Sequence, residues 1–445
     1  MSRMLIRGGR VIDPASGVDA VMDVAIEGDR VVSVGAGLAA SAADEVIDAS
    51  GLIVAPGLID PHVHLREPGQ EERETIASGS AAAVMGGFTT VCCMPNTAPA
   101  LDTASMVRAV LDRALAAAAC RVFPIGAVSK GRGGEELAEI ALMAKAGAVG
   151  FSDDGDVLAS AGLMRKALGA VRATGLALMQ HCQEPTMTRG AAMHAGAVST
   201  RLGLVGWPRE AEEVIVERDV RLARAAGARY HVQHISSAGS VEIVRRARED
   251  EALRELVTAE ATPHHMLLTD AACESGPRGA YDTMCKMNPP LRTEADAKAI
   301  REAVAEGVIT VLGTDHAPHT PESKATDFAS ASFGIVGLET ALALYAKALI
   351  EPGLIDWPGL IELMTVNPAR LCGLDRRGLG RLEAGGPADV TIIDPDLAWT
   401  IRAAEFAGKG RNTPFEGWEV RGRAVGTIVA GRRVWEVKSG ASSPA

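Results

Sequence analysis

Two histidines lie two positions apart at the end of a short apolar run, in the segment GLIDPHVH that ends at His64. If this run is a β-strand, its period of two turns His62 and His64 to the same face, where both can bind one metal ion. A His-x-His pair is weak evidence by itself, because such pairs also occur for structural reasons. Its position after an apolar run favours a metal site.

Three further candidate ligands follow similar apolar runs: His181 in ALMQHC, His234 in YHVQHIS and Asp315 in VLGTDHAPH. The alternative for each histidine is a hydrogen-bonded core residue, and the alternative for Asp315 is a cap of the next helix. An unpaired carboxylate after a buried run would be costly, and a metal ion would remove that cost. Convergence of all these groups favours ligation over the alternatives.

The segment SDDG offers one more carboxylate, from Asp153 or Asp154. Adjacent strand residues face opposite ways, so only one can reach the centre, and periodicity does not choose between them. His231 lies three residues before His234, so alternation predicts that it packs against the helical layer, outside the site.

Four imidazoles and two carboxylates suit zinc or another borderline divalent ion. Their number favours two bridged ions, with one ion as the alternative.

The elements that must position these residues are apolar runs that lead into alanine-rich helical sequence. Eight such runs occur: GLIDPHVH, TTVCCMPN, RVFPIGAV, AVGFSDD, ALMQHC, ARYHVQHIS, LVTAEATPHH and ITVLGTDHAPH. Buried parallel strands that alternate with helices predict an α/β fold, a (β/α)8 barrel of the TIM type. In such a barrel reactive residues lie at the C-terminal ends of the strands, so the candidate ligands would meet at one mouth.

The two chain ends have a different pattern. Short β segments with turn residues between them fill residues 1–56, and similar segments return at 388–396 and 422–437. We therefore predict a small discontinuous β-sandwich domain, residues 1–56 and 386–445, and a metal-dependent hydrolase barrel at 57–385.

The composition excludes several classes of protein. A net charge of −11 without a lysine or arginine cluster argues against binding to nucleic acid or an anionic membrane. The seven cysteines form no CxxC pair, and no apolar run is long enough for a signal or a membrane span. We expect a cytoplasmic protein, in which an anionic substrate would need a locally placed cation.

Five motifs carry a specific resemblance: HVHLREPG (62–69), GGFTTVCCMPNT (86–97), KMNPPLR (286–292), GTDHAPHT (313–320) and FGIVGLE (333–339). Together they closely resemble the dihydroorotases of the amidohydrolase superfamily, and the likeness covers essentially the whole chain. Many relatives bridge their metals with a carbamylated lysine, but AGAVGFSDDG contains none. The sequence therefore is similar to the class I bacterial type, in which an aspartate bridges.

This resemblance implies a zinc site with six ligands. They are His62, His64, Asp154 and Asp315 for the first ion, and Asp154, His181 and His234 for the second. The implied reaction is the reversible hydrolysis of dihydroorotate, or cyclisation of N-carbamoyl-L-aspartate, in pyrimidine (UMP) biosynthesis. A metal-held hydroxide would attack the ring amide, while Asp315 passes a proton to the ring nitrogen.

The resemblance also implies a set of substrate contacts: His64, Arg66, Asn96, Asn288, His319, Phe333 and Gly334. Arg66, Asn96 and His319 would bind the substrate carboxylate, with Arg66 as the local cation. The alternatives are a surface salt bridge for Arg66, turn caps for Asn96 and Asn288, and a plain loop at 333–334. His194, His264 and His265 are left outside the site.

Two other functions compete with this interpretation. An allantoinase or hydantoinase would share the barrel and metals without needing the carboxylate contacts. An inactive scaffold for aspartate transcarbamoylase would lose metal ligands, whereas this chain retains all six. We expect a homodimer with a small-molecule substrate, and association with aspartate transcarbamoylase remains open.

Overall fold

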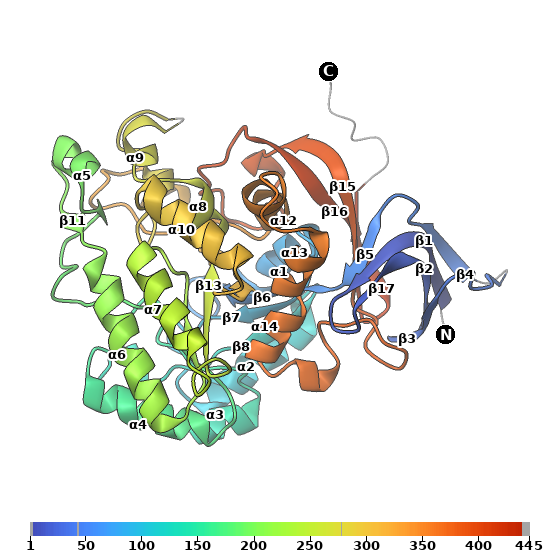
Figure 1. Ribbon diagram of the computed structural model, residues 1–445, viewed down its shortest axis with the longest axis horizontal. Coiled ribbons are helices and arrows are strands. Elements are labelled where there is room, and N and C mark those ends of the chain that lie inside the picture. Colours follow the sequence, from blue (N-terminus) through green and yellow to red (C-terminus); the bar gives the residue numbers. More distant parts are fainter. Residues whose placement is uncertain (1–2, 42–43, 277, 438–445) are drawn as a thin grey trace.

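The computed structural model describes residues 3–41, 44–276 and 278–437. Figure 1 shows a β-rich part that contains the first strands and the last strands of the chain, beside a larger part in which strands alternate with helices. Within the described ranges, no helix is both long and apolar enough to cross a membrane.

The β-rich part is one eight-stranded sheet in the order β17-β16-β15-β5-β1-β2-β3, with β4 paired to β1. Its strands are β1 (Arg3–Asp13), β2 (Val18–Glu27), β3 (Arg30–Gly35), β4 (Asp44–Asp48), β5 (Ile53–Pro56), β15 (Val390–Thr400), β16 (Glu419–Val429) and β17 (Arg432–Glu436). Antiparallel pairing of Val390 with Pro56 joins the two chain ends. Ile6, Val54 and Ile392 share its buried core. The domain limits and a two-layer sandwich remain predictions.

The larger part contains short parallel strands, which form one three-stranded and one four-stranded sheet. They are β6 (Leu58–Val63), β7 (Phe88–Cys93), β8 (Arg121–Pro124), β9 (Leu178–Gln180), β12 (Tyr230–Val232), β13 (Val257–Ala261) and β14 (Val311–Leu312). Bridges from Phe151 to Gly126 and to Leu178 link the two sheets, and a bridge from Val63 to His316 links their other edges. Parallel pairing therefore follows one continuous circuit.

The fourth predicted strand, AVGFSDD at 148–154, differs from the prediction. Only Phe151 of this run makes β bridges, and no strand is assigned there. The run contains Gly150, and glycine weakens a strand because it loses more backbone entropy and offers no side chain to pack. The short pair β10 (Met193–His194) and β11 (Gly206–Trp207) lies outside the circuit.

Helices separate these strands, and several of them begin at a side-chain cap. They are α1 (Ile76–Met85), α2 (Ala104–Ala117), α3 (Ile140–Ala146), α4 (Ala161–Arg172), α5 (Ala197–Leu202), α6 (Glu210–Ala226), α7 (Ala238–Glu249), α8 (Pro263–Leu267), α9 (Ala272–Ser275), α10 (Glu294–Ala305), α11 (Pro321–Lys324), α12 (Ala341–Tyr345), α13 (Trp357–Met364) and α14 (Val366–Leu371). Thr75 and Thr293 form capping boxes at α1 and α10, and Gly227 ends α6 in the left-handed region. Thr75 and Thr293 thus mark where α1 and α10 begin, and Gly227 marks where α6 ends.

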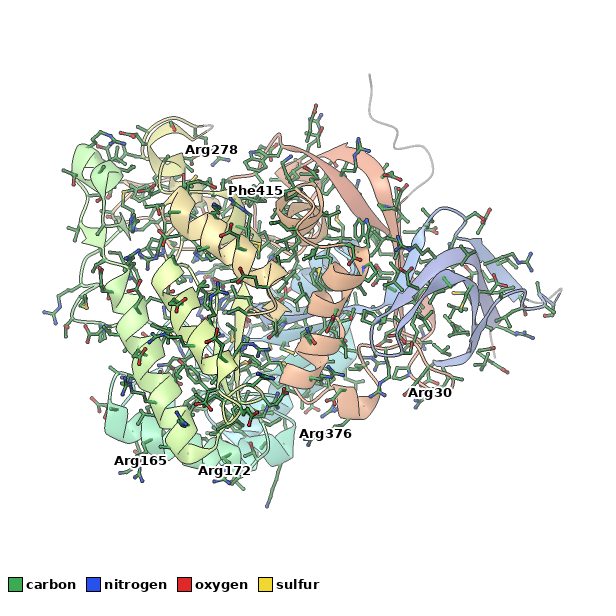
Figure 2. The ribbon with its side chains drawn as sticks, viewed as in Figure 1. Arg30, Arg165, Arg172, Arg278, Arg376 and Phe415 are labelled. Atoms are coloured by element: carbon green, nitrogen blue, oxygen red, sulfur yellow. The ribbon has the colours of Figure 1, made fainter. Side chains whose placement is uncertain are left out.

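The segment between β15 and β16 leaves the sheet and packs against the larger part of the molecule. The Lys409 amide donates to Glu74, before α1, and the Gly408 amide donates to Glu339, before α12. Phe415, labelled in Figure 2, is buried and packs edge-on against Trp418, with ring centroids 5.0 Å apart. This excursion brings C-terminal residues to the loops that follow β14.

Candidate metal-binding and substrate site

The six predicted ligands meet at the C-terminal ends of the parallel strands, and all are buried. We call His62, His64, Asp154, His181, His234 and Asp315 the ligand cluster. His64 Nε2 lies 2.9 Å from Asp315 Oδ1 and 3.4 Å from Asp154 Oδ2. The strand period and the strand-end position therefore bring these side chains together.

Asp154 occupies the middle of the ligand cluster. Its Oδ1 lies 3.4 Å from His62 Nε2, 3.7 Å from His181 Nδ1 and 3.5 Å from His234 Nε2. Ligand atoms within 4.8 Å of one another form three groups: His62, His64 and Asp154; Asp154, His181 and His234; and His62, His234 and Asp315. Asp154, His62 and His234 each belong to two of these groups, and Asp154 is the carboxylate that the first two groups share.

Asp153 has a separate role. Its carboxylate accepts hydrogen bonds from the amides of Val128 and Ser129, at 2.8 and 3.1 Å. It thus faces away from the ligand cluster and ties the loop after β8 to the loop that carries Asp154. The structure therefore resolves the choice that periodicity leaves open.

Hydrogen bonds at the second ring nitrogen orient three of the histidines. His62 Nδ1 donates to Glu260 at 2.5 Å, His64 Nδ1 to Asn96 Oδ1 at 2.8 Å, and His181 Nε2 to Gln183 Oε1 at 2.9 Å. Each acceptor fixes the tautomer, so the opposite nitrogen presents a lone pair to the cluster. This arrangement is typical of metal-ligating histidines.

The donor set fits a divalent metal ion. Within the described ranges, His62 Nε2, Asp154 Oδ1 and His234 Nδ1 are buried without a hydrogen-bond partner. Buried polar atoms are costly unless they are hydrogen-bonded or coordinate a metal. Four imidazoles and two carboxylates also match the ligands that zinc and similar ions prefer.

The electrostatics favour an ionised Asp154 and a neutral His181. Burial acts to lower the pKa of His62 and of His234, but the carboxylates around them outweigh it and raise both values, that of His62 well above its usual range. Burial alone would raise the pKa of Asp154, but the charge of His62 and the nearby His234 outweigh it and hold the pKa well below its usual range. Burial and the neighbouring His234 lower the pKa of His181 to about 4. Asp154 as a carboxylate and His181 as a neutral imidazole are in the protonation states that bind a cation, and a bound metal ion would displace the protons of His62 and His234.

The prediction for His231 is wrong. His231 does not pack against the helical layer: its Nε2 lies 3.1 Å from Glu260 Oε2 and its Nδ1 2.8 Å from Thr258 Oγ1. His234 has a φ of 30°, in the left-handed region, so the backbone leaves the strand between the two histidines and alternation no longer applies. His231 thereby supports Glu260, which in turn orients His62.

The ligand cluster opens into a cavity of about 350 Å³, which we call the strand-end cavity. Its lining includes the predicted substrate residues His64, Arg66, Asn96, Asn288, His319, Phe333 and Gly334. The ligand atoms and the predicted carboxylate contacts therefore share one concave site.

Arg66 and His319 form one wall of the strand-end cavity. Arg66 Nε donates to Pro318 O at 3.3 Å, its guanidinium lies 3.4 Å from His319 Nε2, and this nitrogen donates to Phe333 O at 2.6 Å. Burial and the charge of Arg66 lower the pKa of His319 to about 2, so the ring is neutral. A buried guanidinium without a carboxylate beside it is a ready partner for an anion.

On the opposite wall of the strand-end cavity, the Asn288 side-chain amide and the Gly334 backbone already make hydrogen bonds within the protein. Asn288 Nδ2 donates to Gln183 Oε1 at 3.2 Å, and the Gly334 amide donates to Lys286 O at 3.0 Å. Gly334 O accepts from Asn412 and Lys324. Gly334 therefore shapes the cavity with its backbone groups already bonded, and its predicted contact remains a prediction.

Sequence reasoning missed several supporting residues. Glu260 stands out in hindsight, because a carboxylate inside the apolar run VTAEA needs a buried partner. Gln183 and Asn412 carry no comparable signal. Of the histidines left outside the cluster, His265 bonds Pro289 O at 2.9 Å and His194 lies 3.3 Å from Arg292. His264 is buried close to His265, with ring centroids 4.5 Å apart.

Comparison with known proteins places the chain in a family. A family profile described as Dihydro-orotase-like matches residues 51–240. The chain is 48% identical over 433 residues to the dihydroorotase of Geobacter sp. (strain M21), an alignment that covers 97% of this chain and 99% of that protein. The chain belongs to the dihydroorotase family. A family member from Pelotomaculum thermopropionicum is also 48% identical, over 98% of this chain and 99% of its own length.

Solved structures of other amidohydrolases share the fold. The L-hydantoinase (dihydropyrimidinase) of Arthrobacter aurescens superposes with a TM-score of 0.86 at 26% identity, over 98% of this chain and 96% of that chain. The dihydropyrimidinase of Brevibacillus agri gives a TM-score of 0.82 at 23% identity, covering 97% and 94%. Hydantoinases are thus more distant in sequence than the dihydroorotases.

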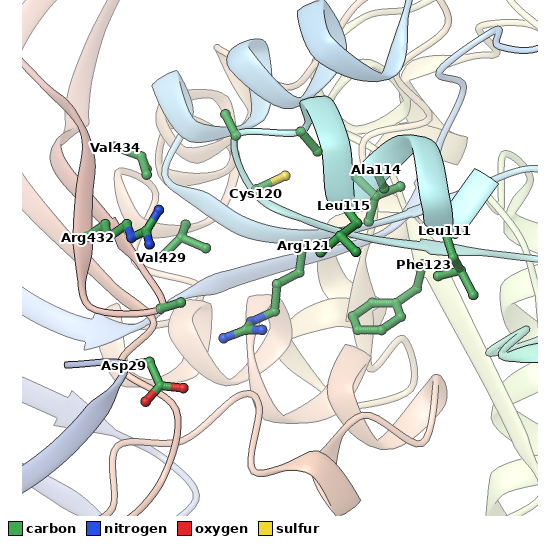
Figure 3. Close-up of a pocket in the computed structure, with 14 residues that line it drawn as sticks. Asp29, Leu111, Ala114, Leu115, Cys120, Arg121, Phe123, Val429, Arg432 and Val434 are labelled. Carbon is green, nitrogen blue, oxygen red and sulfur yellow. The ribbon is translucent and has the colours of Figure 1, made fainter. Parts of the chain in front are cut away.

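A second and larger cavity, of about 540 Å³, lies where strand β8 begins. We call it the strand-start cavity. It lies between α2, the beginning of β8 and β17, and Figure 3 shows Leu111, Leu115 and Phe123 along it. Arg121 in its wall is paired with Asp389, at 2.6 Å. Its lining is mostly apolar and offers no convergent set of metal ligands among the described residues.

Proposed function

We propose that the protein is a dihydroorotase, which hydrolyses the cyclic amide of dihydroorotate and cyclises N-carbamoyl-L-aspartate in the reverse direction. One observation carries this proposal: the ligand cluster and a buried arginine that could bind a carboxylate line the same cavity. Membership of the dihydroorotase family supports it. A hydantoinase substrate lacks the carboxylate that Arg66 would bind, so that alternative leaves the arginine without a role.

We propose zinc as the metal, with His62, His64, Asp154 and Asp315 around one ion and Asp154, His181 and His234 around a second. Asp154 would bridge the two, and a single ion is the alternative. A divalent ion bound here lowers the pKa of a water molecule and polarises the amide carbonyl.

Asp315 would move the proton in this proposal. It borders the strand-end cavity, and His64 lies 2.9 Å from its carboxylate. Burial alone would raise the pKa of Asp315, but the charge of His62 and the neighbouring His64 lower it, so the carboxylate is ionised and can accept a proton. It takes a proton from the attacking water and gives it to the ring nitrogen as the C–N bond breaks. In the biosynthetic direction it takes a proton from the ureido nitrogen.

The carboxylate of the substrate would bind to Arg66, Asn96 and His319, which we call the carboxylate clamp. Arg66 would provide the positive charge, and its position beside His319 would set the side of the cavity on which the substrate carboxylate binds. Asn288, Phe333 and Gly334 would contact the ring, and His64 would lie against the reacting amide. Holding the amide carbonyl at the ligand cluster removes the cost of bringing the reactants together.

The architecture that goes with this function is a (β/α)8 barrel at 57–385 with a β domain from 1–56 and 386–445. The continuous circuit of parallel pairings supports the barrel. We further propose a cytoplasmic homodimer, and an association with aspartate transcarbamoylase can be tested by mixing the two proteins on a size-exclusion column.

The test is a substrate panel. The purified protein should hydrolyse dihydroorotate and cyclise carbamoyl-aspartate, with kcat/KM for dihydroorotate exceeding that for allantoin, hydantoin and dihydrouracil by about a hundredfold or more. Equal or faster turnover of a substrate without a carboxylate would replace this proposal with the hydantoinase alternative.

A further inference from the structure

We infer that Asn412 is a positioning residue for the carboxylate clamp, although it belongs to the C-terminal segment that the sequence assigns to the β domain. This inference rests on the proposed function and adds a residue to its site. The Asn412 side chain does not line the strand-end cavity; it acts through the two loops that do.

Four hydrogen bonds join Asn412 to these loops. Its Oδ1 accepts from the His319 amide at 3.0 Å, while its Nδ2 donates to Ala317 O at 2.9 Å and to Gly334 O at 3.0 Å. Its own carbonyl accepts from the Val336 amide at 3.0 Å. One side chain therefore fixes the loop that carries His319 and the loop that carries Phe333 and Gly334.

The geometry specifies asparagine. Oδ1 faces one donor and Nδ2 faces two carbonyl acceptors, so the amide cannot be turned over without placing an oxygen against two oxygens. Asn412 is only 2% exposed, so water cannot replace these bonds at low cost. An aspartate of the same shape would keep the acceptor and lose both donations.

Gly410 gives independent evidence that residues 410–412 pack closely against the loop that carries His319 and the loop that carries Phe333 and Gly334. A Cβ at Gly410 would lie 2.5 Å from Val336 Cγ1 and 2.7 Å from Pro318 Cβ. The backbone of 410–412 is thus pressed against both loops, and Arg66 bonds Pro318 O from the other side. The position of His319 relative to Arg66 depends on this contact.

The central experiment compares Asn412→Asp and Asn412→Ala with Thr413→Val in the metal-loaded enzyme. Thr413 is an equally buried neighbour whose hydroxyl accepts from Phe415 N, at 3.2 Å, within the same segment. Both Asn412 variants should raise the KM for dihydroorotate about tenfold or more, with kcat within about threefold and zinc content unchanged, because ground-state binding is lost. Thr413→Val should leave KM within about twofold, whatever its effect on Tm.

Hydrogen exchange gives a readout that does not need activity. In Asn412→Asp, amides of 316–319 and 333–336 should exchange faster, while those of 58–64 keep their wild-type rates. If both Asn412 variants lower Tm but leave KM and these exchange rates unchanged, the residue is merely structural and the inference is overturned. A wild-type protein that does not turn over dihydroorotate would refute the proposed function instead, and exchange would still decide the role of Asn412.

Gly410→Ala provides a second route if the Asn412 variants do not fold. It displaces Pro318 and Val336 while the Asn412 side chain is unaltered, and it should also raise KM about tenfold. An unchanged KM in a folded Gly410→Ala protein would contradict the inference.

Discussion

The strand-start cavity and the strand-end cavity differ sharply in what lines them. The strand-start cavity is the larger, at about 540 Å³ against about 350 Å³, yet Arg121 in its wall is already paired and its walls are mostly aliphatic. The strand-end cavity is smaller and holds the ligand cluster. The comparison indicates that chemistry is marked by converging buried polar groups without partners, and that volume is a poor guide.

The difference between the two cavities follows from strand direction. Side chains just after the last residue of each strand lie on loops, whose sequence is free to vary. Side chains at the beginning of each strand are constrained by packing against helices. His64, His181 and His234 all lie one or two residues beyond a strand end. Three residues there, Arg66, His234 and Asp315, have positive φ, a backbone cost that is tolerated mainly at functional sites.

The largest expected effect is a loss of turnover in a strand-end cavity variant that a strand-start cavity variant does not share. Asp315→Asn should fold and lower kcat for dihydroorotate by about 10²–10⁴-fold, because the proton acceptor is lost, and it should bind metal less tightly. Leu115→Ser changes a side chain in the strand-start cavity that is 90% exposed, and it should leave kcat and KM unchanged. Steady-state kinetics and zinc content measure both. Wild-type turnover in Asp315→Asn would exclude its assigned role.

A second pair of variants compares the arginines of the two cavities. Arg66→Met should raise the KM for dihydroorotate by about 10- to 100-fold, because a charge-assisted hydrogen bond to the carboxylate is lost. Arg121→Met breaks the pair with Asp389 and should lower Tm while KM stays the same. A matching rise in KM in the two variants would show that the carboxylate clamp is wrongly placed.

A smaller effect is expected one contact away from the ligand cluster. Glu260→Gln should weaken zinc binding about 10- to 100-fold, because the bond to His62 Nδ1 no longer carries a charge. Asp389→Asn alters the carboxylate that pairs with Arg121, away from the ligand cluster, and should leave zinc affinity unchanged. Chelator competition followed by metal analysis measures the zinc affinity of both variants. Equal affinities would show that Glu260 does not strengthen zinc binding through His62.

The smallest effect concerns stability. Lys324 is 1% exposed, and burial together with the charge of Lys286 lowers its pKa from 10.5 to about 7. Between these pH values the unfolded chain holds more protons, so the free energy of unfolding should rise with pH, by at most about 1.4 kcal/mol per unit. Denaturant unfolding at pH 7 to 9 should give a shallower slope in Lys324→Met. An unchanged slope would mean that folded Lys324 keeps an ordinary pKa.

Much of the site could be predicted from local sequence, because strand period and strand-end position are local properties. They bring His62, His64, His181, His234 and Asp315 to one face without knowledge of the loops. The same rule could not choose Asp154 over Asp153, and it misplaced His231 because the left-handed backbone at His234 is a property of the folded loop.

Other features depend on contacts between distant parts of the chain. Asn412 meets His319 and Gly334 across separations of 93 and 78 residues, and nothing in its local pattern indicates those partners. The fourth run of the circuit was predicted as a strand on apolarity alone, while the structure keeps only the bridges of Phe151. Hydrogen bonds between distant residues determine the structure at such positions, and local sequence periodicity does not indicate these bonds.

Metal content and turnover measured in the same sample test the central claim most directly. Purified protein should contain one or two zinc ions per chain, lose dihydroorotate turnover when a chelator removes them, and regain it when zinc is added back. The circular dichroism spectrum should stay the same throughout. Full turnover in a sample shown to be free of divalent metal would contradict the account.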